Sequence, residues 1–160
     1  YRRQRQMCIE TDYIRRNGVP EKPGLHEFLS WLKEHSIKVA VATSTTRRVA
    51  EDYWKQSGID QYIDASVCGD EVINSKPDPE IFLKAASLLK VPIAACMVAE
   101  DSINGLKAAR AAGAISCMIP DLTPYTKELF PFCDYVSPSL LACKEILLQT
   151  PEADKLKSWK

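Results

Sequence analysis

The sequence lacks several features that mark common protein classes. It has no apolar run long enough to cross a bilayer as a helix. It also lacks an excess of either charge, because 21 basic and 21 acidic residues give a formal net charge of zero. A balanced charge argues against a general nucleic-acid or acidic-membrane binder. We therefore expect neither a nucleic acid nor a membrane among the partners of this protein.

Histidines and closely paired cysteines are also scarce. The only two histidines, His26 and His35, lie in one charged helical segment, so we expect no histidine-based metal site. The six cysteines include no C-x-x-C pair, and three of them lie in apolar runs typical of strands. We interpret them as small hydrophobic residues in a reducing compartment, and we expect a cytoplasmic protein without a disulfide framework or zinc site. They are Cys8, Cys68, Cys96, Cys117, Cys133 and Cys143.

The start of the chain is unusual. The first residue is Tyr1 rather than a methionine, and residues 2–16 have a basic, helical pattern. An opening of this kind is typical of the interior of a longer protein. The 160 residues are enough for one domain with a hydrophobic core. We therefore expect one domain that is a piece of a longer protein.

Apolar runs alternate with helical patterns along the rest of the chain. The expected helices cover residues 23–35, 47–57, 78–90, 103–112 and 138–149. The expected strands cover residues 37–42, 65–69, 95–99, 115–119 and 135–136. Strands that are apolar throughout and alternate with helices indicate a parallel sheet covered on both faces. The sequence therefore predicts an α/β fold.

The most informative position is the end of the run 95–99, where Glu100 and Asp101 follow directly. Open α/β sheets bind ligands at the carboxyl ends of their strands. Two adjacent carboxylates repel each other there and stay ionised at little cost only beside a cation. This pattern predicts a divalent-metal site. The alternative is that one acidic residue caps the next helix, which explains one carboxylate better than two.

Four hydroxyl residues and an arginine, Thr43 to Arg47, lie between a predicted strand and a predicted helix. Free backbone N–H groups and the helix dipole favour an anion at such a place. The alternative is ordinary N-capping, which needs one hydroxyl rather than four.

A third group surrounds Lys76. Pro77 favours an extended conformation at Lys76, and Asp78 can cap the following helix, with Pro79 in its first turn. The alternative is an ordinary surface lysine. Together the three groups supply a hydroxyl, a cation and carboxylates for a metal, which are components of phosphoryl transfer. A nucleophile is missing from this set.

In order and spacing, Thr43, then Ser75-Lys76-Pro77, then Glu100-Asp101-Ser102-x-x-Gly105 resembles three motifs of the haloacid dehalogenase-like superfamily. The closest resemblance is to its β-phosphoglucomutase-like and small-molecule phosphatase branch. It covers the chain from about residue 18 onward. It implies a Rossmann-like core at 19–160 and, at 1–18, the remnant of a helical cap.

The resemblance also implies roles for individual residues. Thr43 would bind the transferring phosphoryl group, and Ser44 would contribute its backbone amide. Lys76 would neutralise phosphate charge and hold the nucleophile. Asp101 would ligate Mg²⁺ directly, and Glu100 would act mainly through a metal-bound water. Further substrate-contact candidates are Thr45, Thr46 and Arg47.

One family motif is absent from the sequence. The D-x-D-G-T-like segment, whose first aspartate is the nucleophile, should precede the cap on a central strand. Asp12, Asp52 and Asp60 do not lie where they could replace it. We therefore expect the missing N-terminal segment of the same protein to be a partner of this chain, which would be inactive without it.

Three other functions are weighed against a phosphatase of a small phosphorylated metabolite, such as a sugar phosphate. A β-phosphoglucomutase-like phosphotransferase shares the motifs, but the phosphatases are the larger class. A receiver-like signalling module also combines an acidic pair, Thr or Ser and Lys-Pro on a parallel sheet. Its acidic pair comes first in the chain, whereas here it comes last. The third alternative is a non-catalytic fragment whose carboxylates only cap helices.

Overall fold

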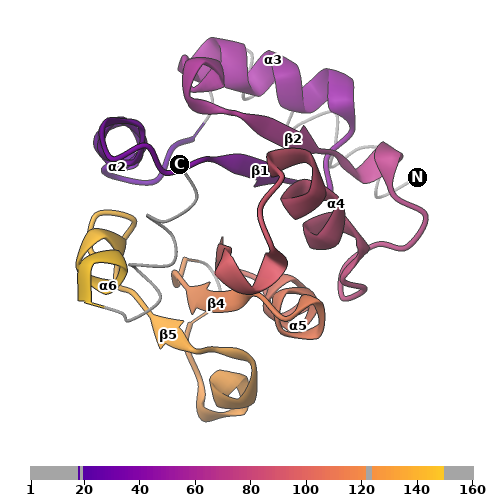
Figure 1. Cartoon of the computed structure of the whole chain (residues 1–160), viewed down its shortest axis with the longest axis vertical. Helices are drawn as coiled ribbons and strands as arrows, with labels where there is room; N and C mark the ends of the chain where they lie inside the picture. Colours follow the sequence, from indigo (N-terminus) through magenta and orange to yellow (C-terminus); the bar gives the residue numbers. More distant parts are fainter. Residues whose placement is uncertain (1–17, 19, 122–123, 150–160) are drawn as a thin grey trace.

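The computed structural model describes residues 18, 20–121 and 124–149. In this part of the chain, strands and helices alternate along the sequence (Figure 1). The strands are β1 (Ala40–Ala42), β2 (Ala65–Val67), β3 (Met97–Glu100), β4 (Ile115–Met118) and β5 (Tyr135–Val136). The α-helices are α2 (Leu25–Glu34), α3 (Arg47–Ser57), α4 (Glu80–Leu89), α5 (Ile103–Ala112) and α6 (Cys143–Gln149). Short 3₁₀ turns are η1 (Asp60–Tyr62), η2 (Gly69–Glu71), η3 (Ile93–Ala95) and η4 (Lys127–Phe132).

All strand pairs in the described residues are parallel, which confirms the predicted α/β fold class. They form two sheets, with β1 beside β2 and with β4 between β3 and β5. Within the described residues, β1 and β3 do not pair with each other, and residues of both strands line the same pocket. The parallel arrangement therefore has a gap at its centre.

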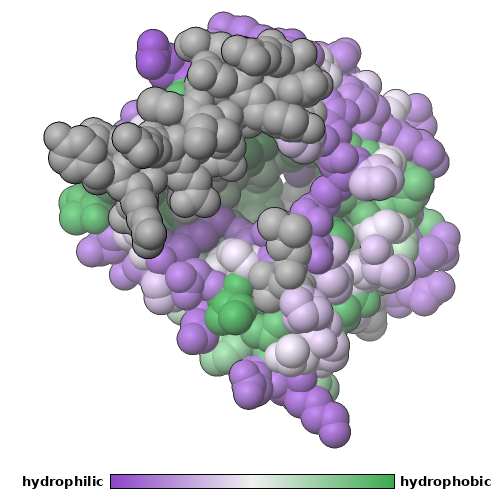
Figure 2. Space-filling view, turned by 180° about the vertical axis from the view of Figure 1, so that it is seen from behind, coloured by the Kyte–Doolittle hydropathy of each residue, from purple (hydrophilic) through white to green (hydrophobic). Residues whose placement is uncertain are grey.

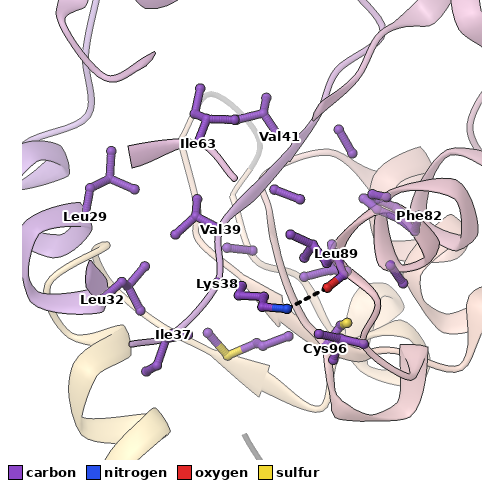
Figure 3. A pocket seen from close by; sticks show the side chains of 18 of the residues that line it. Leu29, Leu32, Ile37, Lys38, Val39, Val41, Ile63, Phe82, Leu89 and Cys96 are labelled. Atoms are coloured by element: carbon purple, nitrogen blue, oxygen red, sulfur yellow. Dashed lines mark hydrogen bonds between the residues drawn. The ribbon is translucent and has the colours of Figure 1, made fainter. Parts of the chain in front are cut away.

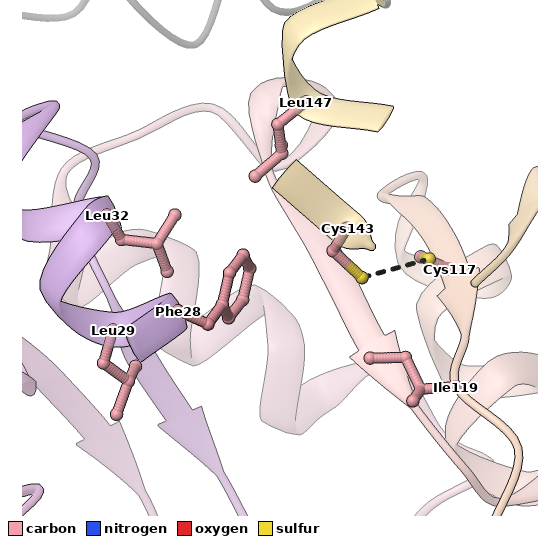
Figure 4. Packing of buried hydrophobic residues seen from close by; sticks show 7 residues of the cluster. All are labelled: Phe28, Leu29, Leu32, Cys117, Ile119, Cys143 and Leu147. Carbon is pink, nitrogen blue, oxygen red and sulfur yellow. Dashed lines mark hydrogen bonds between the residues drawn. The ribbon is translucent and has the colours of Figure 1, made fainter. Parts of the chain in front are cut away.

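Two apolar layers cover the strands, one on each face. Helices α2 and α6 contribute one layer, in which Phe28 of α2 points toward Cys143 and Leu147 of α6 and clusters with Cys117 of β4 (Figure 4). Helices α4 and α5 contribute the other, through Ile81, Phe82 and the alanines of α5. In Figure 1 these two helix pairs lie to the left and the right of the strands. The expectation of helices on both faces is confirmed.

Local sequence signals set the helix ends. Helix α3 stops at Gly58 and α5 at Gly113, both with a positive φ that glycine adopts readily. Helix α5 starts where the Ser102 hydroxyl accepts the Gly105 N–H at 3.0 Å. Helix α6 begins later than predicted, at Cys143, because a turn in which the Ser139 hydroxyl accepts the Ala142 N–H precedes it.

Further predictions concern the cysteines, membrane-spanning helices and the domain boundary. The cysteines in the described part of the chain are free thiols. No helix among the described residues has the length and apolar character needed to span a membrane. The predicted helix at 2–16 lies outside the described residues. The boundary between a cap remnant at 1–18 and a core at 19–160 stays a prediction.

The surface of the molecule has a hollow on the side opposite to the view of Figure 1. Figure 2 shows this hollow with hydrophobic residues at its base.

Candidate functional site

Lys76 joins the carboxyl ends of two strands that belong to different sheets. Its ammonium donates to the Ala42 carbonyl at the end of β1, at 3.3 Å, and to the Glu100 carboxylate at the end of β3. Both charged side chains are only about a tenth exposed. The ammonium also lies 4.8 Å from the centre of the Phe82 ring. The structure thus places Lys76 between the two strand ends. It is largely buried and paired, unlike an ordinary surface lysine.

Glu100 is held from the other side by the start of α5. One carboxylate oxygen accepts the Ser102 hydroxyl at 2.9 Å and the Ser102 N–H at 3.3 Å. The carboxylate also packs on Gly105, where an added Cβ would lie 2.0 Å from the Glu100 Cδ atom. Ser102 is therefore the residue that caps α5, and Glu100 is the ionic partner of Lys76. Its predicted action through a metal-bound water stays a prediction.

Asp101 lies at the same edge and is about half exposed. The Lys22 ammonium lies 3.8 Å from its carboxylate and 2.8 Å from that of Asp121, which follows β4. No set of three or more His, Cys, Asp or Glu side chains in the described part of the chain is placed to hold a metal ion. Asp101 offers a carboxylate oxygen, the ligand type that Mg²⁺ prefers. The predicted roles of Asp101 and Glu100 toward Mg²⁺ stay predictions.

The hydroxyl-rich loop 43–46 follows β1 directly. The Thr43 hydroxyl accepts the Thr45 N–H at 3.1 Å, so its own proton remains available to a ligand oxygen. Thr46 precedes α3, but its side chain makes no capping hydrogen bond. The N–H of Arg47 is instead accepted by Asp70 at 2.9 Å. Ordinary capping therefore does not account for the four hydroxyl residues of this segment.

The Arg47 side chain is engaged by β2 and η2. Its guanidinium donates to both Glu71 carboxylate oxygens, at 2.7 and 3.1 Å, and to the Ser66 hydroxyl and carbonyl. The hydrogen bond from Arg47 lowers the pKa of Glu71 below its ordinary value. The predicted substrate contact of Arg47 is untested, and these contacts occupy the guanidinium.

The loop that precedes Lys76 is fixed by Glu80 in the first turn of α4. The Glu80 carboxylate accepts the backbone N–H groups of Ile73 at 3.0 Å and Asn74 at 2.8 Å. It also pairs with Lys84 at 2.9 Å. The two backbone hydrogen bonds, together with Lys84, lower the pKa of Glu80 to about 2. Glu80 therefore holds the loop that presents Lys76.

This arrangement predicts a pH-dependent contribution of Glu80 to stability. Its folded-state pKa of about 2 lies below the ordinary value of 4.5, so the stabilisation is present above that ordinary value and is lost as the pH falls toward 2. Glu80→Gln should lower the urea midpoint at neutral pH, and this difference from the wild type should shrink on acidification. Urea unfolding of the variant and the wild type at acid and neutral pH measures this difference. Glu34→Gln, on the exposed face of α2, is the control, and a pH-independent effect of Glu80→Gln would contradict the prediction.

An apolar slot separates β1 from β3 and has a volume of about 320 Å³ (Figure 3). Consecutive residues of both strands line it, and side chains of α2 and α4, among them Leu29 and Phe82, close its two sides. Near one end the Lys38 ammonium donates to the Leu89 carbonyl at 2.9 Å. Toward the other end the lining includes Ala42 and Glu100, both bonded to Lys76. The slot therefore leads to the candidate site.

The structure brings two of the predicted residues, Lys76 and Glu100, into direct contact. Sequence reasoning missed several of their neighbours. Lys22 and Asp121 were not proposed as site residues, nor were Ser66 and Glu71. For Asp121 a signal existed, because it follows an apolar run just as Asp101 does. Lys22 gave no such signal, since it reaches Asp121 across 99 positions of sequence.

The model of the haloacid dehalogenase-like hydrolases matches residues 7–113. The chain belongs to this family of haloacid dehalogenase-like hydrolases. The resemblance inferred from its three motifs is thereby confirmed.

Individual members of this hydrolase family are similar over large parts of the chain. The phosphorylated carbohydrates phosphatase of Thermotoga maritima is 43% identical over 95 residues, which are 59% of this chain and 44% of that protein. The crystal structure of CbbY from Rhodobacter sphaeroides in complex with phosphate is 31% identical, with a TM-score of 0.68, over 74% of this chain and 54% of that chain. The β-phosphoglucomutase of Clostridium difficile, at 24% identity and a TM-score of 0.66 over 85% of this chain and 55% of that chain, supports the fold alone. This chain thus spans about half the length of these relatives.

Proposed function

We propose that the protein containing this chain is a cytoplasmic, Mg²⁺-dependent phosphatase of a small phosphorylated metabolite, such as a sugar phosphate. The reaction would proceed through an aspartyl-phosphate formed on an aspartate outside these 160 residues. The names of the relatives support the substrate class, because one is a phosphorylated carbohydrates phosphatase and another was crystallised with phosphate.

The observation that carries this proposal is the slot between β1 and β3. Its two bounding strands lack a partner on their facing edges within the described residues, and its walls are apolar. An apolar parallel strand would satisfy these edges and fill the slot. Its carboxyl end would lie beside Lys76 and Glu100, since parallel strands end at one edge of a sheet. We assign this place to the N-terminal segment of the same protein, which would carry the nucleophile.

The residues of this chain would bind and orient the phosphoryl group. The Thr43 hydroxyl would donate to a phosphoryl oxygen, and the Ser44 N–H would do the same from the backbone. The Lys76 ammonium would neutralise part of the phosphate charge and hold the nucleophilic carboxylate. Such fixed donors are effective because phosphoryl transfer depends mainly on positioning and charge neutralisation.

Magnesium would be held by Asp101 together with carboxylates of the N-terminal segment. When bound, it would supply positive charge to the phosphoryl oxygens. The Lys22 ammonium lies near both Asp101 and Asp121 and contributes positive charge at this edge.

A phosphate-release screen on the full-length protein tests the proposed function. A panel of small phosphate monoesters, including sugar phosphates, should yield orthophosphate in the presence of Mg²⁺, and EDTA should abolish the release. Asp101→Asn should require more Mg²⁺ for half-maximal rate, whereas Asp121→Asn serves as the neighbouring control. Conversion to an isomeric phosphate without release would indicate a mutase. Failure to process any monoester would support the non-catalytic or signalling alternatives.

A further inference from the structure

We infer that η2, the segment Gly69–Glu71, is a positioning element that fixes the anion-binding loop 43–46, and that it acts through Arg47. The inference rests on the proposed function in one respect only, namely that loop 43–46 binds a phosphoryl group. It gives Arg47 a positioning role in place of the predicted substrate contact.

Three successive residues of η2 contact the loop or its continuation into α3, two of them at the main chain and one at the Arg47 side chain. Gly69 donates its N–H to the Thr45 carbonyl at 2.9 Å. Asp70 accepts the Arg47 N–H at 2.9 Å, and Glu71 forms the two-pronged pair with the Arg47 guanidinium. These contacts are made at Thr45 and Arg47, directly after Ser44. They therefore restrain the end of the loop that carries the groups proposed to meet a phosphate.

The backbone of η2 lies so close to the loop that there is no space for a side chain at Gly69. A Cβ added to Gly69 would lie 2.2 Å from the Ser44 carbonyl oxygen, which is backbone and cannot move aside as a side chain could. Glu71 is itself anchored, because it accepts the Cys68 N–H at 2.8 Å and its carbonyl accepts the Lys84 ammonium at 2.7 Å. The loop is therefore tied to a fixed segment of the fold.

Charge explains why an arginine is needed at this contact. Asp70 and Glu71 are carboxylates close to a loop that would bind an anion, and without a cation they would repel it. Arg47 directly follows the loop, donates its N–H to Asp70 and pairs with Glu71 in a bidentate manner. It therefore links η2 to the loop and also offsets the negative charge of η2.

The test compares Glu71→Gln with Glu51→Gln in the full-length protein. Glu51 is the matched control because it also approaches the Arg47 guanidinium, at 3.7 Å, but from α3 itself and without a contact to η2. For each variant we would measure kcat, KM and the inhibition by orthophosphate. We would also record the ¹⁵N–¹H resonances of residues 44–46. Glu71→Gln should lower kcat/KM and weaken orthophosphate inhibition by about tenfold each, as expected for lost positioning. It should also shift the loop resonances, whereas Glu51→Gln should match the wild type.

The alternative outcomes separate this inference from the proposed function. If Arg47 contacts substrate instead, Arg47→Met will raise KM while Glu71→Gln leaves orthophosphate inhibition and the loop resonances unchanged, which would overturn the inference. Asp70→Asn gives the same comparison should Glu71→Gln fail to fold. If the wild type releases no phosphate, the proposed function fails. The loop resonances still decide the inference, since equal spectra for Glu71→Gln and Glu51→Gln would refute it.

Discussion

Lys76→Met is expected to lower kcat of the full-length enzyme by about 10²- to 10³-fold, the usual cost of removing one charge-stabilising donor from a reacting group. Methionine keeps most of the volume of the lysine but lacks its charge. The Glu100 carboxylate, which is about a tenth exposed, would lose its ionic partner. Breaking a largely buried pair in this way should destabilise the protein by about 3 kcal/mol.

A second substitution separates the two effects of Lys76→Met. In the double variant Lys76→Met/Glu100→Gln no unpaired charge remains, so most of the lost stability should return while the activity should not. Urea unfolding and phosphate-release kinetics on the two variants and Glu100→Gln measure this difference. Recovery of activity in the double variant, or a Lys76→Met enzyme that turns over like the wild type, would contradict the assigned role.

Gly105→Ala is expected to reduce kcat/KM by about 10²-fold although it touches no substrate group, because a displacement of about 1 Å at a catalytic group can have this effect. The new Cβ would lie 2.0 Å from the Glu100 Cδ and 2.2 Å from one of its oxygens. The carboxylate must therefore move, and Lys76, which is bonded to it, must move as well.

The stability of Gly105→Ala should change little, because two effects oppose each other. Gly105 is the third residue of α5, and alanine is favoured over glycine within a helix by up to about 1 kcal/mol. The displaced Glu100, in contrast, weakens its contacts with Ser102 and Lys76. Asn104→Ala, at the exposed neighbouring position of α5, is the matched control for helix propensity. Gly105→Ala should therefore lose activity at nearly unchanged thermal midpoint, and full activity in this variant would show that the Glu100 position is not critical.

Much of the fold could be predicted because the signals are local. The pattern of apolar runs fixed the order of strands and helices, and the bounds of α3 and α5 match the prediction at both ends. Residues that directly follow strands were brought to one edge, as the geometry of a parallel sheet requires. Glu100 ends β3 at this edge for this reason. Lys76 reaches the same edge from the loop between β2 and α4, 24 positions away in the sequence, so its contact with Glu100 depends on how that loop packs.

The contacts that could not be predicted are those between loops. Arg47 pairs with Glu71 and Ser66 because β2 and η2 happen to lie beside the start of α3, and no periodicity in the sequence encodes this. Lys22 reaches Asp101 and Asp121 from the segment before α2 for the same reason. Such long-range pairs depend on how the elements pack, so a residue pattern identifies the candidates but not their partners.

The covalent position of the phosphoryl group decides the central proposal most directly. The full-length protein is incubated with a phosphate monoester that it hydrolyses, and the reaction is quenched in acid. Borohydride reduction then converts any phosphoaspartate into a product that peptide mass spectrometry can locate. The proposed function predicts one labelled aspartate in an N-terminal segment outside these 160 residues, with none at Asp52, Asp60 or Asp101. A labelled aspartate within these residues would contradict the assignment of the slot to a nucleophile-bearing strand.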